Sequence, residues 1–470
     1  MADFKAIIAS NMMLKLISEL ATKDELETYV VGGFVRDALL ERPLTDIDIV
    51  CIGSGIELAV ALKERLGPSA NLTVYQSFGT AAVTYQGEVV EFVGARKESY
   101  RKDSRKPIVE NGSLQDDQNR RDFTINALAV SLLEHNLGQL IDPFDGVSDI
   151  KRKIIKTPLE PKITFSDDPL RMMRAVRFAA QLKFDIEANT FEGIRSMADR
   201  IDIVSKERVA DELHKIVLSP VPSFGFKLLY HSDLLKHIFP EFEKLKGVSV
   251  RDGKGHKDNF YHTLQVLDNI SEVTDELWLR WAAIMHDIAK PATQRFNKRA
   301  GWTFHGHEDL GAKWVPKIFR RMKLPLNDHM KYVQKLVKLH LRPIALVKEE
   351  VTDSAVRRLV FEAGDDIDDL MMLCRADITS KNHDKVRKYL ANFGKVEQKI
   401  KEVEEMDRVR NFQNPVTGED IMQLFNVEPS KIIGELKEEI KEAILEGVIP
   451  NEREAAIKLM RNIAQKKGLV

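Results

Sequence analysis

The chain has 470 residues, of which 43% are hydrophobic, with 17 Pro and 25 Gly. This length predicts two to four domains, and the composition excludes a collagenous or a wholly disordered protein. The 71 basic and 72 acidic residues nearly cancel, so the net charge of −1 gives no argument for a nucleic-acid partner.

Cysteine content and hydropathy indicate the compartment. Cys51 and Cys374 are the two cysteines and lie far apart in sequence, which argues against a disulfide-stapled secreted protein. No apolar run approaches the roughly 20 residues that span a bilayer, and the N-terminal segment lacks a signal peptide's pattern. We therefore expect a cytoplasmic protein without a membrane partner.

Residues 28–93 alternate short β-rich runs with helical runs, which predicts a small mixed sheet. In order, these runs are TYVV, FVRDALLE, DIDIV, GIELAVALKERLG, LTVY, TAAVTY and EVVEFV, and a Gln86-Gly87 turn separates the last two. Segment 96–119 is charged and has little apolar periodicity, so we expect a mobile surface loop. Beyond Ile155 the apolar residues recur at helical spacing, which predicts that the rest of the chain is all-α.

The first pattern with chemical meaning is VVGGFVRDALLERPLTDIDIV. A strand ends at a Gly-Gly pair, a helix follows, and the next strand carries Asp46 and Asp48. Residues two apart on a strand share a face, so both carboxylates can hold the same Mg²⁺ ions, as phosphoryl transfer requires. A third carboxylate should come from a neighbouring strand, where Glu91 is the candidate and Glu88 lies nearer the hairpin turn. An isolated D-x-D usually marks exposed strand residues, so the prediction depends on the joint pattern.

Two later runs could select the nucleotide. In RRDFTINA the two arginines can pair with phosphates while Asp122 accepts a ribose hydroxyl; alternatively, Asp122 or Thr124 caps a helix. In DDPLR, Asp168 at the N-cap and Pro169 at the first helical position would start a helix. Asp168 and Arg171 also lie on one side of that helix, where together they can read the Watson–Crick edge of cytosine or adenine.

The joint pattern GGxVRDxLLxRxxxDxD resembles the motif of nucleotidyltransferases related to polymerase β. Specifically, it resembles the motif of the bacterial-type tRNA nucleotidyltransferases, the CCA-adding enzymes, and their poly(A) polymerase relatives. RRDFTINALA looks like their ribose-recognition motif. DDPLR looks like their E-D-x-x-R motif, with Asp167 in place of Glu. Residues 205–213 resemble their E-R-x-x-x-E-L element, which would support Asp168 and Arg171; without the family match, a surface helix with charge pairs is an equal interpretation.

The resemblance also implies roles for individual residues. Asp46 and Asp48 would bind catalytic Mg²⁺, Glu91 would complete the catalytic set, and Arg36-Asp37 would support the glycine turn. The residues expected to bind the nucleotide are Gly32, Gly33, Arg36, Arg120, Arg121, Asp122, Asn126, Asp168, Arg171, Arg174 and Arg177.

Eight of the 12 histidines lie between His256 and His383, which makes this the region to search for metal ligands. The order H…HD…H…H…D resembles the HD phosphohydrolase superfamily, in which imidazoles and carboxylates hold one or two divalent metals that activate water. A single histidine is more often an ordinary surface or core residue, but six residues in this order favour a site. The implied metal ligands are His262, His286, Asp287, His307, His340 and Asp377. The histidines outside the pattern are His256, His305, His329 and His383.

The predicted fold is α+β, with a small mixed-sheet nucleotidyltransferase head followed by an all-α neck, body, HD domain and helical tail. We expect the head at 1–155 and the neck and body, with the nucleotide-selecting motif, at 156–255. The HD domain should occupy 256–385, and the tail, which should contact tRNA, 386–470.

The activity that the resemblance implies is transfer of CMP and AMP from CTP and ATP to the 3′ end of tRNA. It implies Mg²⁺ in the head and a divalent metal of unassigned identity in the HD site, and it leaves the oligomeric state open. The alternatives are a poly(A) polymerase, an enzyme that adds only C or only A, and chiefly an HD-type nucleotide phosphohydrolase. Guanosine-tetraphosphate synthetase/hydrolases combine such domains with the HD domain first, the reverse of this order. Both sets of carboxylates disfavour a non-catalytic RNA-binding module.

Overall fold

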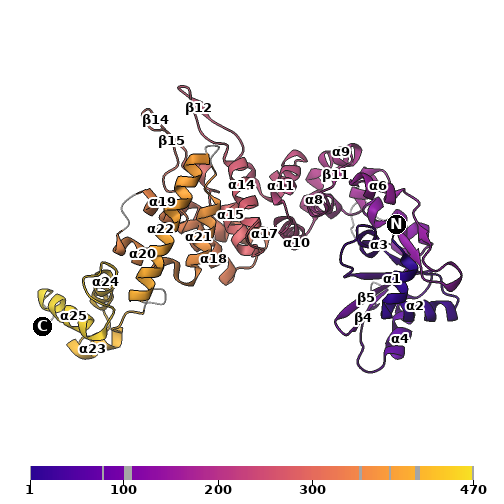
Figure 1. Cartoon of the computed structure of the whole chain (residues 1–470), viewed down its shortest axis with the longest axis horizontal. Helices are drawn as coiled ribbons and strands as arrows, with labels where there is room; N and C mark the ends of the chain where they lie inside the picture. Colours follow the sequence, from indigo (N-terminus) through magenta and orange to yellow (C-terminus); the bar gives the residue numbers. More distant parts are fainter. Residues whose placement is uncertain are drawn as a thin grey trace. The chain divides into compact units, whose positions relative to one another are not determined.

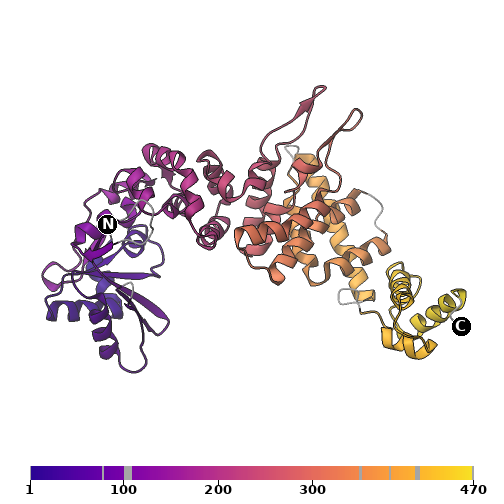
Figure 2. The same cartoon turned by 180° about the vertical axis from the view of Figure 1, so that it is seen from behind.

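The computed structural model describes residues 2–76, 79–99, 108–348, 352–379, 383–407 and 413–467 (Figures 1 and 2). The chain divides into two compact units, Met1–Ile238 and Phe239–Val470. Among the residues described, no helix combines the length and the apolarity that a membrane span requires.

A seven-stranded sheet in the order β3-β4-β5-β2-β1-β8-β9 lies at the centre of the N-terminal unit. β2 and β5 are parallel, and the other neighbouring strands are antiparallel, which confirms the predicted mixed sheet. The strands are β1 (Thr28–Val31), β2 (Ile47–Cys51), β3 (Asn71–Tyr75), β4 (Thr80–Tyr85), β5 (Glu88–Gly94), β8 (Ala129–Ser131) and β9 (Leu140–Ile141).

Helices cover this sheet and continue the chain beyond it. α4 packs on β3, β4 and β5; Ser54 caps its first turn by accepting the Glu57 N–H, and Gly67, with φ of 82°, ends it. The helices of this unit are α1 (Phe4–Ser10), α2 (Met12–Lys23), α3 (Gly33–Leu39), α4 (Gly55–Leu66), α5 (Leu114–Asn119), α6 (Gly146–Arg152), α7 (Pro161–Asp167), α8 (Leu170–Leu182), α9 (Ala188–Ser196), α10 (Lys206–Val217), α11 (Pro222–His231) and α12 (Leu234–Ile238).

The β4–β5 hairpin sets the register on which the candidate site depends. Gln86 and Gly87 have φ values of 49° and 86°, the left-handed pair that a two-residue hairpin turn favours. Glu88 lies next to this turn, and three residues later Glu91 lies opposite Asp48 of β2. The hairpin predicted around Gln86-Gly87 is therefore confirmed.

Segment 96–119 is not the predicted surface loop. β6 (Arg96–Ser99) pairs with β7 (Ile108–Asn111), and α5 follows; residues 100–107 lie outside the described residues. Ser113 and Asp116 form a reciprocal capping box at the start of α5. The Ser-x-x-Asp pattern is the sequence signal for this helix.

The region predicted to be all-α also contains short strand pairs. β10 (Ile154–Ile155) pairs with β11 (Asp185–Ile186), β12 (Val250–Arg251) with β13 (Lys254–Gly255), and β14 (Arg295–Asn297) with β15 (Gly301–Thr303). Strands of two or three residues are too short to show a readable alternation.

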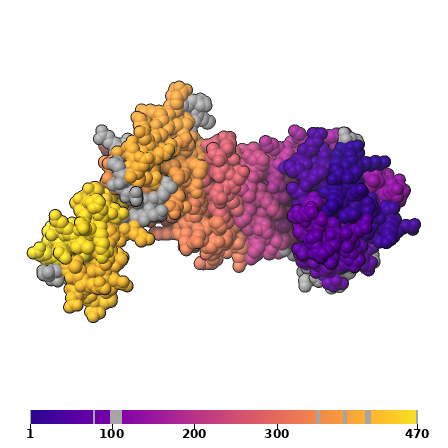
Figure 3. Space-filling view, turned by 60° about the horizontal axis from the view of Figure 1, so that its bottom comes forward, coloured from indigo at the N-terminus to yellow at the C-terminus, as the bar shows by residue number. Residues whose placement is uncertain are grey.

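Helices form most of the C-terminal unit. They are α13 (Pro240–Glu243), α14 (Asn259–Ser271), α15 (Leu277–Met285), α16 (Lys290–Thr293), α17 (His307–Met322), α18 (Asp328–Leu339), α19 (Leu341–Lys348), α20 (Asp353–Ala363), α21 (Ile367–Ala376), α22 (His383–Asp407), α23 (Gly418–Phe425), α24 (Lys431–Leu445) and α25 (Arg453–Lys466). The last three helices form a lobe, yellow in Figure 3, with a core of their own that includes Ile421, Leu436 and Met460. Arg358 of α20 binds Glu442 and so ties this lobe to the helical body.

Candidate active site and metal centre

The glycine turn after β1 gathers the predicted carboxylates at one place on the sheet. Val31, the last residue of β1, pairs with Asp48, whose neighbour on the other side is Glu91 of β5. Gly32 has φ of 73°, and a Cβ there would lie 3.0 Å from the Arg121 guanidinium and 3.5 Å from Asp48 Oδ2. The positive φ therefore favours glycine at this position, and a Cβ there would crowd Arg121.

Asp48 is half-buried, whereas Asp46 and Glu91 are exposed. Asp46 immediately precedes β2, which begins at Ile47, and so does not lie on the strand as predicted. Burial raises the pKa of Asp48, Arg121 opposes this change, and the charges of Glu91 and Asp46 raise the pKa further. Three carboxylates that repel one another in this way are a donor set that fits Mg²⁺.

Asp117 holds the two arginines that were predicted to bind phosphate. Arg121 Nε donates to Asp117 Oδ2 at 2.9 Å, and Arg120 binds the other carboxylate oxygen. Asp117 is completely buried. Burial alone would raise the pKa of Asp117, but Arg121 and Arg120 lower it below its usual value. This role was not predicted from the sequence, although Asp117 lies three and four residues before the two arginines that directly follow α5, and this spacing was the available signal.

Protein groups engage both carboxylate oxygens of Asp122. Oδ1 accepts the Phe123 N–H at 2.9 Å and Asn126 Nδ2 at 3.0 Å, and Oδ2 accepts Arg174 Nε at 2.8 Å. Burial would raise the pKa of Asp122, yet Arg174 and Asn126 lower it to about 2. The predicted bond from Asp122 to a ribose hydroxyl would have to share an oxygen with one of these donors.

Three arginines surround the ring of Phe178. The guanidinium carbons of Arg36, Arg174 and Arg177 lie 5.0, 5.3 and 4.0 Å from the ring centroid. Arg177 Nε also lies 2.6 Å from Glu212 Oε2 on α10. Phe178 thus spaces three of the arginines expected to bind the nucleotide.

Arg36 connects the glycine turn to the RRDFTINA run. Its guanidinium donates to the two Asp37 carboxylate oxygens at 3.0 and 2.7 Å and to Asn126 Oδ1 at 2.7 Å. These contacts are consistent with the turn-supporting role that the resemblance implied.

The predicted base-reading pair lies at the start of α8. The helix begins at Leu170, one residue later than predicted, with Pro169 at the N-cap. Asp168 Oδ1 accepts the Leu170 N–H at 3.1 Å, and Oδ2 accepts a hydrogen bond from Arg208 at 2.9 Å. Arg208 belongs to the run 205–213, so this run supports Asp168 as the resemblance implied.

Arg171 links the predicted base-reading pair to the arginines that were predicted to bind phosphate. Its guanidinium donates to two backbone carbonyls, one of which is that of Arg120 at 2.5 Å. A continuous set of contacts therefore runs from Arg171 through Arg120 and Asp117 to Arg121, which faces Asp48 across the glycine turn.

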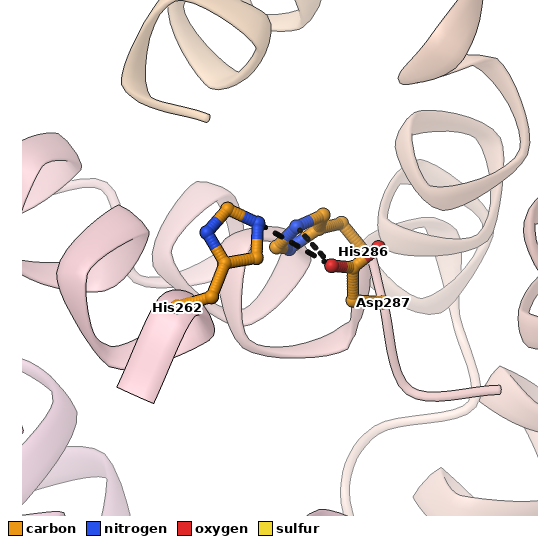
Figure 4. Close-up of side chains that lie close together, drawn as sticks. All are labelled: His262, His286 and Asp287. Carbon is orange, nitrogen blue, oxygen red and sulfur yellow. Dashed lines mark ion pairs between the residues drawn. The ribbon is translucent and has the colours of Figure 1, made fainter. Parts of the chain in front are cut away.

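The six predicted HD residues come together in the C-terminal unit, and Figure 4 shows three of them, including the central Asp287. Asp287 Oδ2 lies 3.4 Å from His262 Nε2 and 3.2 Å from His286 Nε2. Asp287 Oδ1 lies 3.2 Å from His307 Nε2 and 3.9 Å from His340 Nε2. Asp377 closes the group, because its Oδ1 lies 2.9 Å from His262 Nε2.

Three of these histidines have the tautomer of a metal ligand. Nδ1 of His286, His307 and His340 each lies 2.7 Å from the backbone carbonyl three residues earlier. A carbonyl can only accept, so each Nδ1 carries a proton, and in the neutral ring the Nε2 atom then presents a lone pair. Among the described residues these buried Nε2 atoms have no hydrogen-bond partner. Three lone pairs converging on a carboxylate fit a divalent cation.

Electrostatics agree with that fit. Burial and the neighbouring His286 lower the pKa of His340 to about 3, so its imidazole is neutral. Burial would raise the pKa of Asp287, but His286 and Lys290 hold it well below its usual value. Lys290 Nζ lies 2.5 Å from Asp287 Oδ2, and a second lysine, Lys257, lies 3.0 Å from His262 Nδ1.

The remaining histidines of this region lie outside the metal-ligand groups formed by the described residues. His256 packs edge-on against two aromatic rings, and His329 stacks on Trp278. His305 is exposed, and the side chain of His383 lies outside the described residues.

Family models match three parts of the chain. They are a poly A polymerase head domain at residues 28–156, a model described as "Probable RNA and SrmB- binding site of polymerase A" at 183–246, and an HD domain at 259–380. An A-adding tRNA nucleotidyltransferase of Deinococcus radiodurans is 30% identical over 365 residues, which are 76% of this chain and 81% of the relative. The chain belongs to the tRNA nucleotidyltransferase and poly(A) polymerase family.

Other members of this family give the same picture. A multifunctional CCA protein of Shewanella frigidimarina is 33% identical over 64% of this chain and 70% of the relative. The fold is that of the Bacillus stearothermophilus CCA-adding enzyme in complex with CTP, with a TM-score of 0.63 and 24% identity over 97% of this chain and 100% of that one. The head model spans the carboxylates and Asp117, and the HD model spans all six residues of the metal centre.

Proposed function

We propose that this nucleotidyltransferase adds CMP and AMP, from CTP and ATP, to the 3′ end of tRNA and so builds or repairs the CCA end. The observation that carries the proposal is the set of three carboxylates, Asp46, Asp48 and Glu91, near the glycine turn. The contacts that lead from Arg121, beside this turn, to Arg171 support it. Relatives named as CCA proteins and as A-adding enzymes support tRNA as the substrate.

In the proposed reaction the 3′ hydroxyl of the RNA attacks the α-phosphorus of the nucleotide, and the bond to the leaving pyrophosphate breaks. Asp46, Asp48 and Glu91 would hold Mg²⁺, which when bound stabilises charge on the attacking and leaving oxygens. Arg120 and Arg121, oriented by Asp117, bind the triphosphate.

Base choice is proposed to rest on Asp168 and Arg171. A carboxylate accepts the exocyclic amino group of cytosine or adenine, and a guanidinium donates to the ring acceptors. Uracil and guanine carry a carbonyl where that amino group would be, so an acceptor would face Asp168. Arg208 donates to Asp168 Oδ2 and so fixes the carboxylate for this contact.

The test gives the pure protein one tRNA that lacks CCA and one that ends in CC, with each nucleoside triphosphate labelled in turn, and sequences the new 3′ ends. We expect CCA on the first tRNA and a single A on the second. Addition of A to the CC-ending tRNA alone would identify an A-adding enzyme, and a run of A would identify a poly(A) polymerase. Either result would overturn the proposal.

A second function is proposed for the HD centre, carried by the three imidazole Nε2 atoms around Asp287 that have no hydrogen-bond partner among the described residues. We infer that a divalent metal bound there activates water for hydrolysis of a phosphoester, such as the 2′,3′-cyclic phosphate of a damaged RNA end. Such an end has no free 3′ hydroxyl and could not be extended. Parent protein assayed with Mg²⁺, Mn²⁺, Ni²⁺ and Co²⁺ in turn decides this, because no hydrolysis with any of them would reduce the centre to a structural site.

We propose that the chain has four functional parts. They are the head at 1–155, the neck and body at 156–255, the HD domain at 256–385 and the tail at 386–470. The tail is proposed to contact tRNA. A cytoplasmic location also stays a prediction; it is supported by Cys51 and Cys374, which are both buried and unpaired.

A further inference from the structure

Two short β-hairpins project side by side from the C-terminal unit in both Figure 1 and Figure 2. One consists of β12 and β13, the other of β14 and β15, and we call residues 250–255 and 295–303 together the hairpin pair. Lys254 Nζ donates to the backbone carbonyls of Lys298 and Arg299 at 2.8 and 3.0 Å. Trp302 Nε1 donates to the Lys254 carbonyl at 3.0 Å. These bonds make the two hairpins one structural piece.

Ring contacts stiffen the same piece. The Arg251 guanidinium on the first hairpin lies 5.0 Å from the centroid of the Phe296 ring on the second. Phe296 packs edge-on against Trp302, and His256, directly after the first hairpin, packs edge-on against Trp302 as well. The side chains outside this aromatic seam are thus held on a defined surface.

The charge of that surface differs from the charge of the whole chain. The chain has 71 basic and 72 acidic residues, yet the hairpin pair exposes one acidic side chain, Asp252. Its exposed basic side chains are Arg251, Lys254, Arg295, Lys298 and Arg299. Such an excess on a projecting element is the electrostatic footprint of a polyanion-binding surface.

Residues that closely follow the two hairpins contact residues of the metal centre. Lys257, two residues after β13, lies 3.0 Å from His262 Nδ1. Phe304, the residue after β15, accepts the Nδ1–H of His307 through its carbonyl at 2.7 Å. Lys290, which contacts Asp287, precedes β14 by five residues. The basic hairpin pair is therefore joined, within two to five residues of chain, to two lysines beside the HD residues.

We propose that the hairpin pair binds the phosphate backbone of single-stranded RNA and directs its 3′ end to the HD centre. The family acts on RNA ends, and His286 and Asp287 are almost completely buried, so a duplex cannot reach them. Binding of single-stranded RNA at the hairpin pair goes beyond the proposed activities. The destination of the 3′ end rests on the proposed phosphohydrolase function.

Binding is tested on the full chain with a ten-nucleotide single-stranded RNA that carries a 5′ fluorophore and a 3′ phosphate. Anisotropy titrations in EDTA, across a range of salt concentrations, compare the parent with Arg295→Gln/Lys298→Gln/Arg299→Gln. EDTA removes hydrolysis from the measurement, so the result does not depend on whether the HD centre is active. The matched control is Lys313→Gln/Lys317→Gln/Arg320→Gln, which removes three exposed charges from α17 of the same unit.

We expect the hairpin variant to bind about tenfold more weakly at low salt and its salt slope to fall by about 2, since each lost phosphate contact on a single strand contributes about 0.7. The control should stay within about twofold of the parent, because surface changes away from a contact have small effects. Binding by the hairpin variant within twofold of the parent, or an equal loss in the control, would overturn the proposal.

Direction is tested separately by photocrosslinking the parent protein to the same RNA with 4-thiouridine as its last nucleotide. Crosslinks mapped by mass spectrometry should fall in residues 250–257 and 290–305, again without any need for hydrolysis. Crosslinks from the 3′-terminal nucleotide confined to other parts of the chain would show that the hairpin pair does not lead to the HD centre.

Discussion

At the scale of single residues, buried carboxylates determine how the head presents its arginines. Asp117 and Asp122 each bind arginine inside the protein, and neither role was predicted from the sequence. The run DDQNRRD does not show which carboxylates the fold buries, so the spacing of Asp117 from the two arginines was the one available signal for its role. The glycine turn and the pair Asp46 and Asp48 were predicted from their spacing in the sequence, although Asp46 precedes strand β2 rather than lying on it.

The role of Asp117 gives the first prediction. Asp117→Asn keeps the shape but removes the charge that orients Arg120 and Arg121. Because a hydrogen bond to a charged group contributes about 1.5–3 kcal/mol, we expect kcat/KM for ATP to fall about 10- to 150-fold, mainly through a higher KM. Steady-state kinetics at saturating tRNA measure this effect.

The control for this prediction is Asp145→Asn, an exposed residue with φ of 59°, a conformation that asparagine also adopts readily. Equal kcat/KM values for Asp117→Asn and the parent would show that the arginines do not need Asp117.

Base selection gives the second prediction. Asp168→Asn replaces an acceptor with an amide that can also donate, so discrimination between ATP and GTP should fall by about five- to 150-fold, or roughly 1–3 kcal/mol. Competition between the two nucleotides on a tRNA ending in CC measures the ratio. Asp211→Asn, an exposed change on α10, is the control. Unchanged selectivity with lower thermal stability would leave Asp168 only as a helix-capping residue.

At the scale of elements, the predictions succeeded where a pattern was long enough to have a period. The β4–β5 hairpin follows from two alternating runs and a turn that needs φ above zero. The hairpins β12–β13 and β14–β15 were not predicted, because two or three residues carry no period. The metal ligands were predicted without a periodic pattern or a turn signal. They were implied by the order of His and Asp residues along the chain, which resembles the HD superfamily.

The third prediction concerns the helix ends that meet at Asp287. Metal analysis of the purified parent protein should find bound divalent metal, and Asp287→Asn should lose most of it, because this carboxylate faces all four histidines. EDTA should lower the Tm of the parent and leave that of the variant unchanged. Asp309→Asn, exposed on α17, is the control and should keep its metal.

The same variant tests whether the two activities separate. His286 and Asp287 belong to the C-terminal unit, and the nucleotidyltransferase residues belong to the N-terminal unit. We expect Asp287→Asn, and His286→Ala/Asp287→Ala, to retain CTP and ATP addition within about twofold. Loss of addition with an unchanged circular dichroism spectrum would instead show that the two units are coupled.

At the scale of the whole molecule, the predicted α+β architecture and the family are confirmed. The division of the chain between Ile238 and Phe239 could not be predicted, since α12 and α13 follow one another with one residue between them and no linker composition marks the join. The net charge of the whole chain also gives no indication of its local basic surfaces. A balanced total conceals a basic hairpin pair, because net charge averages over surfaces that a ligand meets separately.

The central claim is that the carboxylates at the glycine turn carry out nucleotidyl transfer, and the most direct test is the rate of AMP transfer by Asp48→Asn. Single-turnover measurements use a tRNA ending in CC, with tRNA binding followed separately. We predict a rate about 1,000-fold or more below the parent, equivalent to about 4 kcal/mol of transition-state stabilisation, with tRNA affinity retained. The control is Glu88→Gln. Glu88 is the first residue of β5, beside the hairpin turn, and this variant should retain the parent's rate. A rate for Asp48→Asn within tenfold of the parent would contradict the assignment.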